Sequence, residues 1–283
     1  LPVFAAIGGV VVPALIYLTL NSGTETADGW AIPMATDIAF ALAIISMLGD
    51  KVPLSLKVFL AALAIVDDLM AILVIALFYS SELHYTYLYY ALGLFLLLLV
   101  FNRMGVSAIW AYLIPGAFIW YFIHHSGIHA TIAGVLTAFA LPTKSSIPGR
   151  ESPLLRLEHM LARPVNLLIM PIFALANTNI AFVDGMLDEL ATPLGLGIIL
   201  GLFLGKPIGI FLLSWLSVKA GICTMPKHAN WMHVVGVGML AGIGFTMSIF
   251  IALLSFTGQE LLMAEAKFSI LVASLLSGIC GSL

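Results

Sequence analysis

Residues 54–79 read LSLKVFLAALAIVDDLMAILVIALFY, a run of 26 largely apolar residues with two adjacent acids near its middle. An α-helix needs about 20 apolar residues to cross the hydrocarbon core of a bilayer. Helices suit that environment because every backbone polar group is bonded within the segment. We therefore expect this run to span a membrane. Its acids, Asp67 and Asp68, are candidates for a functional site, because a charge near the bilayer centre costs about 2.5–3.5 kcal/mol.

The composition extends this interpretation to the whole chain. Of its 283 residues, 62% are hydrophobic and 9% are charged, against about 25% charged in soluble domains. Such a chain has too much apolar surface for one water-soluble globule. The net charge of −3 argues against nucleic-acid binding. The two cysteines, Cys223 and Cys280, are too few for a disulfide framework or a metal cluster.

Polar breaks divide the chain into about ten predicted membrane spans. We expect an all-α polytopic membrane protein with one transmembrane domain over residues 1–283. Because the chain starts without Met, inside an apolar stretch that lacks a charged n-region, we also expect a further N-terminal piece. The predicted spans are 1–20, 30–48, 54–79, 87–101, 106–123, 127–141, 164–181, 193–218, 231–256 and 267–283.

Basic residues give the predicted orientation, because Lys and Arg gather in cytoplasmic loops. The loops after the first, third, fifth and seventh spans hold no Lys or Arg, but hold Glu25, Asp28, Glu82, Asp184, Asp188 and Glu189. The chain is therefore expected to end in the cytoplasm, with Lys267 as the one exception to the alternation. The basic residues of the loops after even-numbered spans are Lys51, Arg103, Lys144, Arg150, Arg156, Arg163, Lys219 and Lys227.

The polar residues within the spans allow more than one role. Adjacent helical residues point about 100° apart, so Asp67 and Asp68 are expected to face different surroundings, one a water-filled cavity and one a neighbouring helix. The alternative is a purely structural hydrogen-bonded pair. Asp37 follows Pro33 and Thr36 and either caps a half-helix or ligates an ion. Lys206 either forms an ion pair with Asp67 or compensates helix C-termini.

Glycines interrupt the predicted span 231–256. Gly236, Gly238, Gly242 and Gly244 each weaken a helix by about 1 kcal/mol relative to Ala. Unwound backbone at membrane depth is tolerated where it lines a cavity or is buried in protein. Span 30–48 is interrupted as well, so 1–79 and 193–283 are predicted to be inverted three-span repeats around 87–181, with two broken, crossing helices. Close helix packing through small residues is the alternative explanation of the glycines.

Several strings resemble the NhaA-type sodium/proton antiporter family. They occur in family order along nearly the whole chain. The matching strings are ATDIAFAL at 35–42, LAIVDDL at 63–69, SGIHAT at 126–131, RLEH at 156–159, GKP at 205–207 and GIGFTMSIF at 242–250.

The resemblance implies a bacterial inner-membrane protein of twelve helices, of which this chain lacks about the first two. It implies that Asp68 is the main Na⁺ ligand and that Asp67 pairs with Lys206 and carries protons. Thr36 and Asp37 would then lie where the broken helices cross.

The resemblance also assigns further residues. Unwound backbone at Gly242, Gly244, Phe245 and Thr246 would belong to the second broken helix. His129, Glu158 and His159 match positions that the family associates with pH response. Histidine titrates near neutrality, although a solvated or hydrogen-bonded role at a helix end is the alternative for each. A homodimer is implied too.

The expected function is secondary transport without an enzyme reaction or a cofactor. Carboxylate oxygens suit a hard cation such as Na⁺ or Li⁺, and protonation of the same carboxylates would release it. Two protons for each Na⁺ expelled would make the exchange electrogenic. The chain contains no phosphate-binding glycine motif of the P-loop type.

Three alternatives stay open from the sequence. A cation channel would need rings of carbonyls or acids along a continuous pore. A secondary transporter for organic anions would share the overall architecture. An intramembrane aspartyl protease would need two Asp carboxylates that share a proton, although no Gly-x-Gly-Asp string precedes either acid of the pair.

Overall fold

The computed structural model describes residues 1–49, 52–79, 83–144, 151–177, 190–227 and 229–283. Within these ranges every regular element is a helix, which confirms the all-α fold class. Six loop residues used for the orientation, Lys51, Glu82, Arg150, Asp184, Asp188 and Glu189, lie outside the described residues. So do residues 178–181 of the predicted seventh span.

The number of long apolar helices is smaller than predicted. Seven helical segments of the described chain are long and apolar enough to cross a membrane, or eight if one bent pair is a single span. Two other predicted spans are only short helices, α5 (Trp110–His125) and α6 (Thr131–Ala140). Gly127 separates them at a φ of 87°, and Pro142 follows shortly after α6. The expectation of ten full-length spans is therefore corrected.

The chain forms two compact units, which are described separately. Unit 1 comprises residues 1–71 and 173–283, and unit 2 comprises residues 72–172. Helix α3 (Leu54–Phe78) runs from unit 1 into unit 2. Unit 2 also contains α4 (Tyr85–Arg103), α5, α6 and α7 (Pro153–Pro164), continued by the π-helical turn η3 (Val165–Ile169). Helix α5 packs on both α4 and α6 around buried residues such as Leu98, Tyr112 and Ile119.

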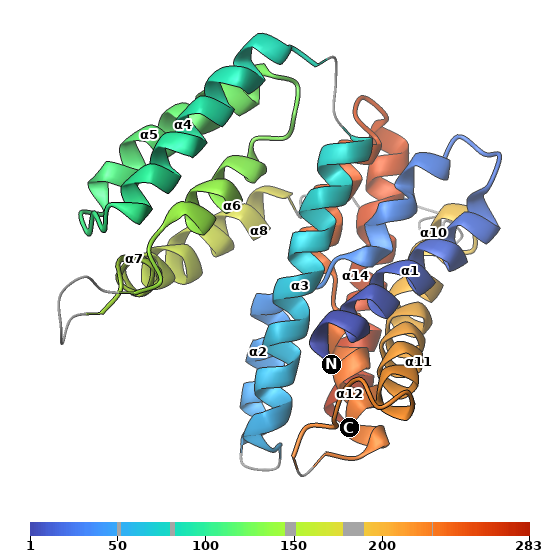
Figure 1. Ribbon diagram of the computed structural model, residues 1–283. Coiled ribbons are helices and arrows are strands. Elements are labelled where there is room, and N and C mark those ends of the chain that lie inside the picture. Colours follow the sequence, from blue (N-terminus) through green and yellow to red (C-terminus); the bar gives the residue numbers. More distant parts are fainter. Residues whose placement is uncertain (50–51, 80–82, 145–150, 178–189, 228) are drawn as a thin grey trace. The chain divides into compact units, whose positions relative to one another are not determined.

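Unit 1 is a bundle built from both ends of the sequence (Figure 1). Helix α1 (Pro2–Asn21) packs along α11 (Lys206–Lys219) and α10 (Pro193–Leu200). Helix α12 (Trp231–Ala241) contacts α11 and also α14 (Glu260–Ser282). A short helix, α8 (Met170–Asn177), begins at the border of the units.

Glycine allows a close contact of two helices in unit 1. A Cβ atom on Gly8 of α1 would lie 2.0 Å from the carbonyl oxygen of Gly209 of α11. Two backbones can approach this closely only where neither residue has a side chain. The sequence left small-residue packing open for the glycines of 231–256, and there a Cβ atom on Gly238 would lie 2.8 Å from the Cα atom of Pro207, whereas one on Gly236 would meet nothing within 4 Å.

Two helices of unit 1 are broken. The first consists of the 3-10 helix η1 (Ala27–Met34), an extended link at 35–37 and α2 (Ile38–Met47). The second consists of α12, residues 242–244 and α13 (Phe245–Ser255), with a bend of 49° between the two helices. A π-helical turn, η4 (Gly201–Gly205), joins α10 to α11. The two broken helices lie in spans 30–48 and 231–256, where Pro33 and the glycines predicted interruptions, whereas the turn η4 was not predicted.

One predicted loop is helical instead. Residues 142–163 were expected to be a basic cytoplasmic loop, but α7 occupies the second half of this region. The Ser152 hydroxyl accepts a hydrogen bond from the Leu155 N–H, and Pro153 occupies the first turn, so the helix has a normal N-terminus. Glu158 and His159 therefore lie on a helix. The segment is an amphipathic helix, and its charged residues led to the prediction of a loop.

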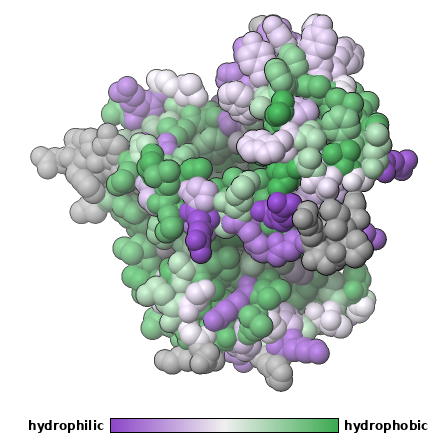
Figure 2. Space-filling view, turned by 90° about the vertical axis from the view of Figure 1, so that its left-hand side faces the viewer, coloured by the Kyte–Doolittle hydropathy of each residue, from purple (hydrophilic) through white to green (hydrophobic). Residues whose placement is uncertain are grey.

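Large apolar side chains point outward as well as inward. Leu77, Leu167 and Leu175 each expose more than three quarters of their surface. Hydrophobic residues cover much of the face drawn in Figure 2, with separate groups of hydrophilic residues between them. Apolar helices with apolar outer faces are typical of proteins whose surroundings are lipid.

Candidate functional site

The two broken helices of unit 1 meet at their breaks. The Asp37 N–H donates a hydrogen bond to the carbonyl oxygen of Ile243, with N and O 2.6 Å apart. The Thr36 hydroxyl oxygen lies 2.8 Å from the carbonyl oxygen of Ala241. Backbone groups that a continuous helix would bond internally therefore bond across the crossing. This satisfies the requirement for paired backbone groups in an apolar environment.

Asp37 binds the N-terminal ends of two helices. Its Oδ1 atom accepts from the Phe40 N–H of α2 at 3.2 Å, and its Oδ2 atom accepts from the Thr246 N–H of α13 at 3.0 Å. The Thr246 hydroxyl donates to the same Oδ2 atom. The carboxylate is almost fully buried. Because helix N-termini carry partial positive charge, they compensate the negative charge of Asp37.

Asp67 forms a buried ion pair with Lys206. The Lys206 Nζ atom donates to Asp67 Oδ2, and both side chains have no exposed surface. Thr36 completes the group: its hydroxyl oxygen lies 2.5 Å from Asp67 Oδ2 and accepts from Lys206 Nζ at 2.8 Å. The ammonium and the carboxylate neutralise each other, which is the condition under which two charges are tolerated in a protein interior.

Lys206 reaches this position from the start of α11, immediately after the π-helical turn η4. Pro207 follows and needs no hydrogen-bond acceptor for its nitrogen. Interruptions of this kind inside α-helices often accompany functional sites. The sequence marked the position only as glycine, lysine and proline in succession.

Asp68 lies beside the ion pair and is less buried than Asp67. Its side chain is partly exposed. The Oδ1 atoms of Asp67 and Asp68 are both buried without a hydrogen-bond partner among the described residues. The charges that act on Asp68 are those of Asp67, Lys206 and Asp37. Asp67 is paired with Lys206, and Asp37 accepts hydrogen bonds from the N-terminal ends of two helices. The role of Asp68 as the main cation ligand stays a prediction.

The predicted pH-response residues belong to unit 2, whereas the carboxylates belong to unit 1. The His129 Nδ1 atom lies 3.1 Å from the Thr131 hydroxyl, in the turn before α6. Partial burial, with a smaller contribution from His124, lowers the pKa of His129 below 6.5. The His159 Nδ1 atom lies 3.5 Å from Glu151 Oε2, and both side chains are mostly exposed.

Sequence reasoning missed two serines beside the second break. The Ser248 hydroxyl of α13 donates to the carbonyl oxygen of Ile32 in η1 at 2.8 Å. The Ser274 hydroxyl of α14 accepts from the Phe245 N–H at 3.1 Å. Thr246 was assigned a backbone role only, yet its side chain binds Asp37. The sequence signal that was available is the set of serines at 269, 274 and 277 in the last predicted span, because polar residues in an apolar span often hydrogen-bond to neighbouring helices.

The Thr36 hydroxyl connects the ion pair to the second break. Its oxygen lies within hydrogen-bond distance of Asp67 Oδ2, Lys206 Nζ and the carbonyl oxygen of Ala241. Across the residues that the structure describes, no three His, Cys, Asp or Glu side chains form a metal-binding group.

The comparisons with known proteins agree with this geometry. A family model described as Na⁺/H⁺ antiporter 1 matches residues 1–283. The chain is 67% identical over 282 residues to the Na⁺/H⁺ antiporter NhaA 2 of Flavobacterium johnsoniae, covering 99% of this chain and 68% of that protein. It is 53% identical over 281 residues to NhaA of Flavobacterium psychrophilum (99% and 72% covered). It is 54% identical over 284 residues to NhaA of Dechloromonas aromatica (100% and 73% covered).

Proposed function

This chain belongs to the Na⁺/H⁺ antiporter 1 family, and from this membership we propose that it expels Na⁺, or Li⁺, from the cytoplasm in exchange for external H⁺. The observation that supports this most directly is Asp68, a largely buried carboxylate beside a neutralised Asp67–Lys206 pair. Exchange of this kind needs one site that holds either ion but not both. Neither ATP nor covalent chemistry is required.

In the proposed cycle, protons and Na⁺ compete for the carboxylates. Deprotonated Asp68 binds Na⁺ through its oxygen atoms, as hard cations prefer. Protonation of Asp68 removes its negative charge and releases the ion. The crossing of the two broken helices then presents the site to the other side of the membrane, by movement of one group of helices against another. Thr36 and Asp37 hold the crossing together.

Asp67 carries the second proton in this proposal. Protonation of Asp67 would break its ion pair with Lys206, and deprotonation would restore it. Two protons then enter for each Na⁺ that leaves, so one net positive charge moves inward per cycle. A membrane potential contributes about 2.3 kcal/mol per charge per 100 mV to such a step. Low pH should suppress exchange, because the carboxylates stay protonated.

We extend the proposal to regulation and assembly. His129, Glu158 and His159 are assigned to the pH response, since histidine titrates in the range where such regulation acts. Residues 1–79 and 193–283 are assigned to inverted repeats, which the broken helices at 27–47 and 231–255 support. The proposed location is the bacterial inner membrane, with a cytoplasmic C-terminus and a homodimeric assembly.

Purified protein in sealed vesicles tests the exchange. A proton gradient is imposed across the vesicle membrane, and Na⁺, Li⁺ or K⁺ is then added while the internal pH is recorded. We expect Na⁺ and Li⁺ to collapse the gradient, faster at pH 8 than at pH 6. A Na⁺ current that does not move protons would indicate a channel and contradict the proposal.

The protease alternative lacks support in the site geometry. A proteolytic pair would hold two carboxylates close enough to share one proton. Here Asp67 binds Lys206, and Asp37 binds the N-terminus of α13. Each of these two carboxylates therefore has partners other than an acid. Cleavage of a transmembrane peptide by the purified protein would overturn this argument.

A further inference from the structure

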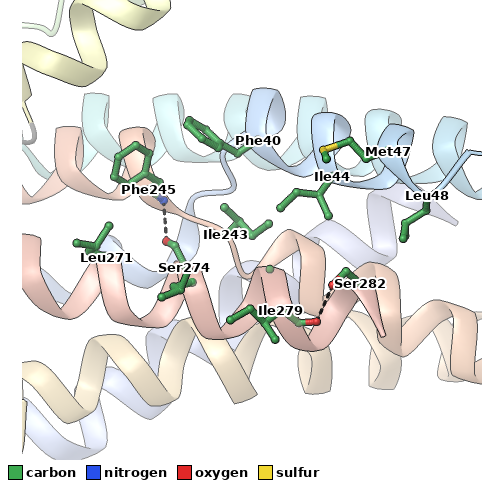
Figure 3. A pocket seen from close by; sticks show the side chains of 12 residues that line it. Phe40, Ile44, Met47, Leu48, Ile243, Phe245, Leu271, Ser274, Ile279 and Ser282 are labelled. Carbon is green, nitrogen blue, oxygen red and sulfur yellow. Dashed lines mark hydrogen bonds between the residues drawn. The ribbon is translucent and has the colours of Figure 1, made fainter.

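Helix α13 begins without a capping side chain of its own. Its N-cap residue is Gly244, which has no side chain to accept hydrogen bonds from the first turn. The first N–H groups of a helix have no partner within the helix. In this chain the missing partner comes from another helix, because the Phe245 N–H donates to the Ser274 hydroxyl of α14. Figure 3 shows Ser274 directed toward the start of α13.

This contact lies one residue from the ion site. Phe245 precedes Thr246, whose N–H and hydroxyl both donate to Asp37. The start of α13 is thus fixed from two sides, by Asp37 from the first broken helix and by Ser274 from α14. Phe40 and Phe245 add an edge-to-face ring contact with centroids 5.1 Å apart.

The surroundings of Ser274 leave the Phe245 N–H few other acceptors. Ser274 is 7% exposed and lines a cavity of about 570 Å³. The other walls of this cavity are largely apolar, with Ile44, Leu271 and Ile279 among them (Figure 3). A backbone N–H that faces an apolar wall without an acceptor is costly. The hydrogen bond from the Phe245 N–H to the Ser274 hydroxyl therefore fixes the position of the first turn of α13.

We propose that Ser274 is a positioning residue for cation exchange, which holds the N-terminus of α13 where Thr246 compensates the charge of Asp37. This inference rests on the proposed Na⁺/H⁺ exchange. Ser274 touches no transported ion. It acts through Phe245 and Thr246 on the crossing that adjoins Asp67 and Asp68.

The test compares three variants in the vesicle exchange assay. Ser274→Ala removes the acceptor, and we expect the apparent KM for Na⁺ to rise about fivefold, the equivalent of one net hydrogen bond, with turnover largely retained. Ser274→Thr keeps the hydroxyl, and the adjoining cavity has room for the added methyl group. We therefore expect Ser274→Thr to restore the wild-type KM.

Ser269→Ala is the matched control. Ser269 lies on the same helix, is fully buried, and its hydroxyl has no hydrogen-bond partner among the described residues. Its removal should leave the KM for Na⁺ unchanged. An equal rise in KM for Ser269→Ala, or failure of Ser274→Thr to restore it, would overturn the inference, since either result indicates a general effect on the packing of α14.

The two proposals fail in different ways. If the wild-type protein does not exchange Na⁺ for H⁺, the proposed function is wrong. If the wild-type protein exchanges and Ser274→Ala keeps the wild-type KM and pH profile, only the positioning role is wrong. A Ser274→Ala variant that loses turnover but keeps its KM also contradicts the positioning role, because such a loss reflects structure alone.

Discussion

Buried charge at single residues sets the chemistry of this protein. Lys206 and Asp67 have no exposed surface and neutralise each other. Such a pair is a weak source of stability, yet removal of one partner is strongly destabilising, because the remaining charge is left buried and unpaired. Asp68, beside the pair, keeps its charge available. The two adjacent carboxylates therefore differ in their partners, since Asp67 is paired with Lys206 and Asp68 is not.

The cost of an unpaired Asp67 can be measured. We expect Lys206→Met to lower the free energy of unfolding by about 3–5 kcal/mol, because Asp67 then stays buried without a cation. The double variant Asp67→Asn/Lys206→Met should regain much of that loss. Thermal unfolding in detergent at neutral pH measures both. Equal destabilisation by the single and double variants would show that Lys206 contributes packing and not charge compensation.

The role of Asp68 has an equally direct test. We expect Asp68→Asn to abolish proton release from the purified protein when Na⁺ is added, because an amide cannot exchange a proton for a cation. Glu25→Gln is the control, since Glu25 is an exposed acid outside the helices. The control should release protons like the wild type. Undiminished release from Asp68→Asn would remove Asp68 from the ligand role.

Among the elements, glycine has two separate uses. Gly242 and Gly244 flank the link at the second break, whereas Gly8 and Gly209 let α1 and α11 approach closely. A Cβ atom on Gly8 would meet the backbone of α11, which cannot move aside as a flexible side chain can. Gly236 of α12 is different, because a Cβ atom there meets nothing within 4 Å. Sequence alone does not distinguish these glycines.

Alanine substitution should separate the two kinds of glycine. We expect Gly8→Ala to lower the free energy of unfolding by about 1–3 kcal/mol through overpacking. Gly236→Ala is the matched substitution at a site where the added Cβ atom meets no neighbour. It should raise the free energy of unfolding by about 0.5–1 kcal/mol, because Ala has the higher helix propensity. Thermal unfolding of both variants is the measurement. Stabilisation by Gly8→Ala would contradict the close contact of α1 and α11.

At the scale of the whole chain, the carboxylates belong to unit 1 and the predicted pH-response residues to unit 2. His129 has a pKa below 6.5 in the folded protein. Between that lowered pKa and 6.5, the unfolded chain binds more protons at this position than the folded one. Stability from this residue is therefore complete above 6.5 and is lost as the pH falls through this range.

This predicts a change in the pH dependence of unfolding. We expect His129→Gln to flatten the decline in melting temperature as the pH falls from 7 to 5, since the substituted residue takes up no proton. Melting temperatures of wild type and variant across that range provide the test. Identical slopes would show that proton uptake by His129 is not linked to folding.

The local features of this protein follow from sequence. Runs of about 20 apolar residues predict membrane-spanning helices. Acidic residues near the middle of such a run predict a functional site, because a charge at that depth costs free energy. Pro33 and four glycines, at 236, 238, 242 and 244, predicted interrupted helices, because backbone preference is a property of the residue itself. Gly236 and Gly238 lie within the continuous helix α12, and only Gly242 and Gly244 lie at the break. Helix α7 was missed for a local reason too, since its Arg, Glu and His residues resemble those of a loop.

The tertiary structure decided between the alternatives that the sequence left open. Lys206 was expected either to pair with Asp67 or to compensate helix C-termini, and the ion pair with Asp67, 139 residues away, is the one observed. The Asp37 carboxylate accepts a hydrogen bond from the N–H of Thr246, at the start of α13 and 209 residues away in sequence. Helices that are apolar on every side carry little periodic signal, so the direction of each polar side chain depends on how the neighbouring helices pack. That packing also brought Ser274 to Phe245, a contact that no spacing in the sequence indicates.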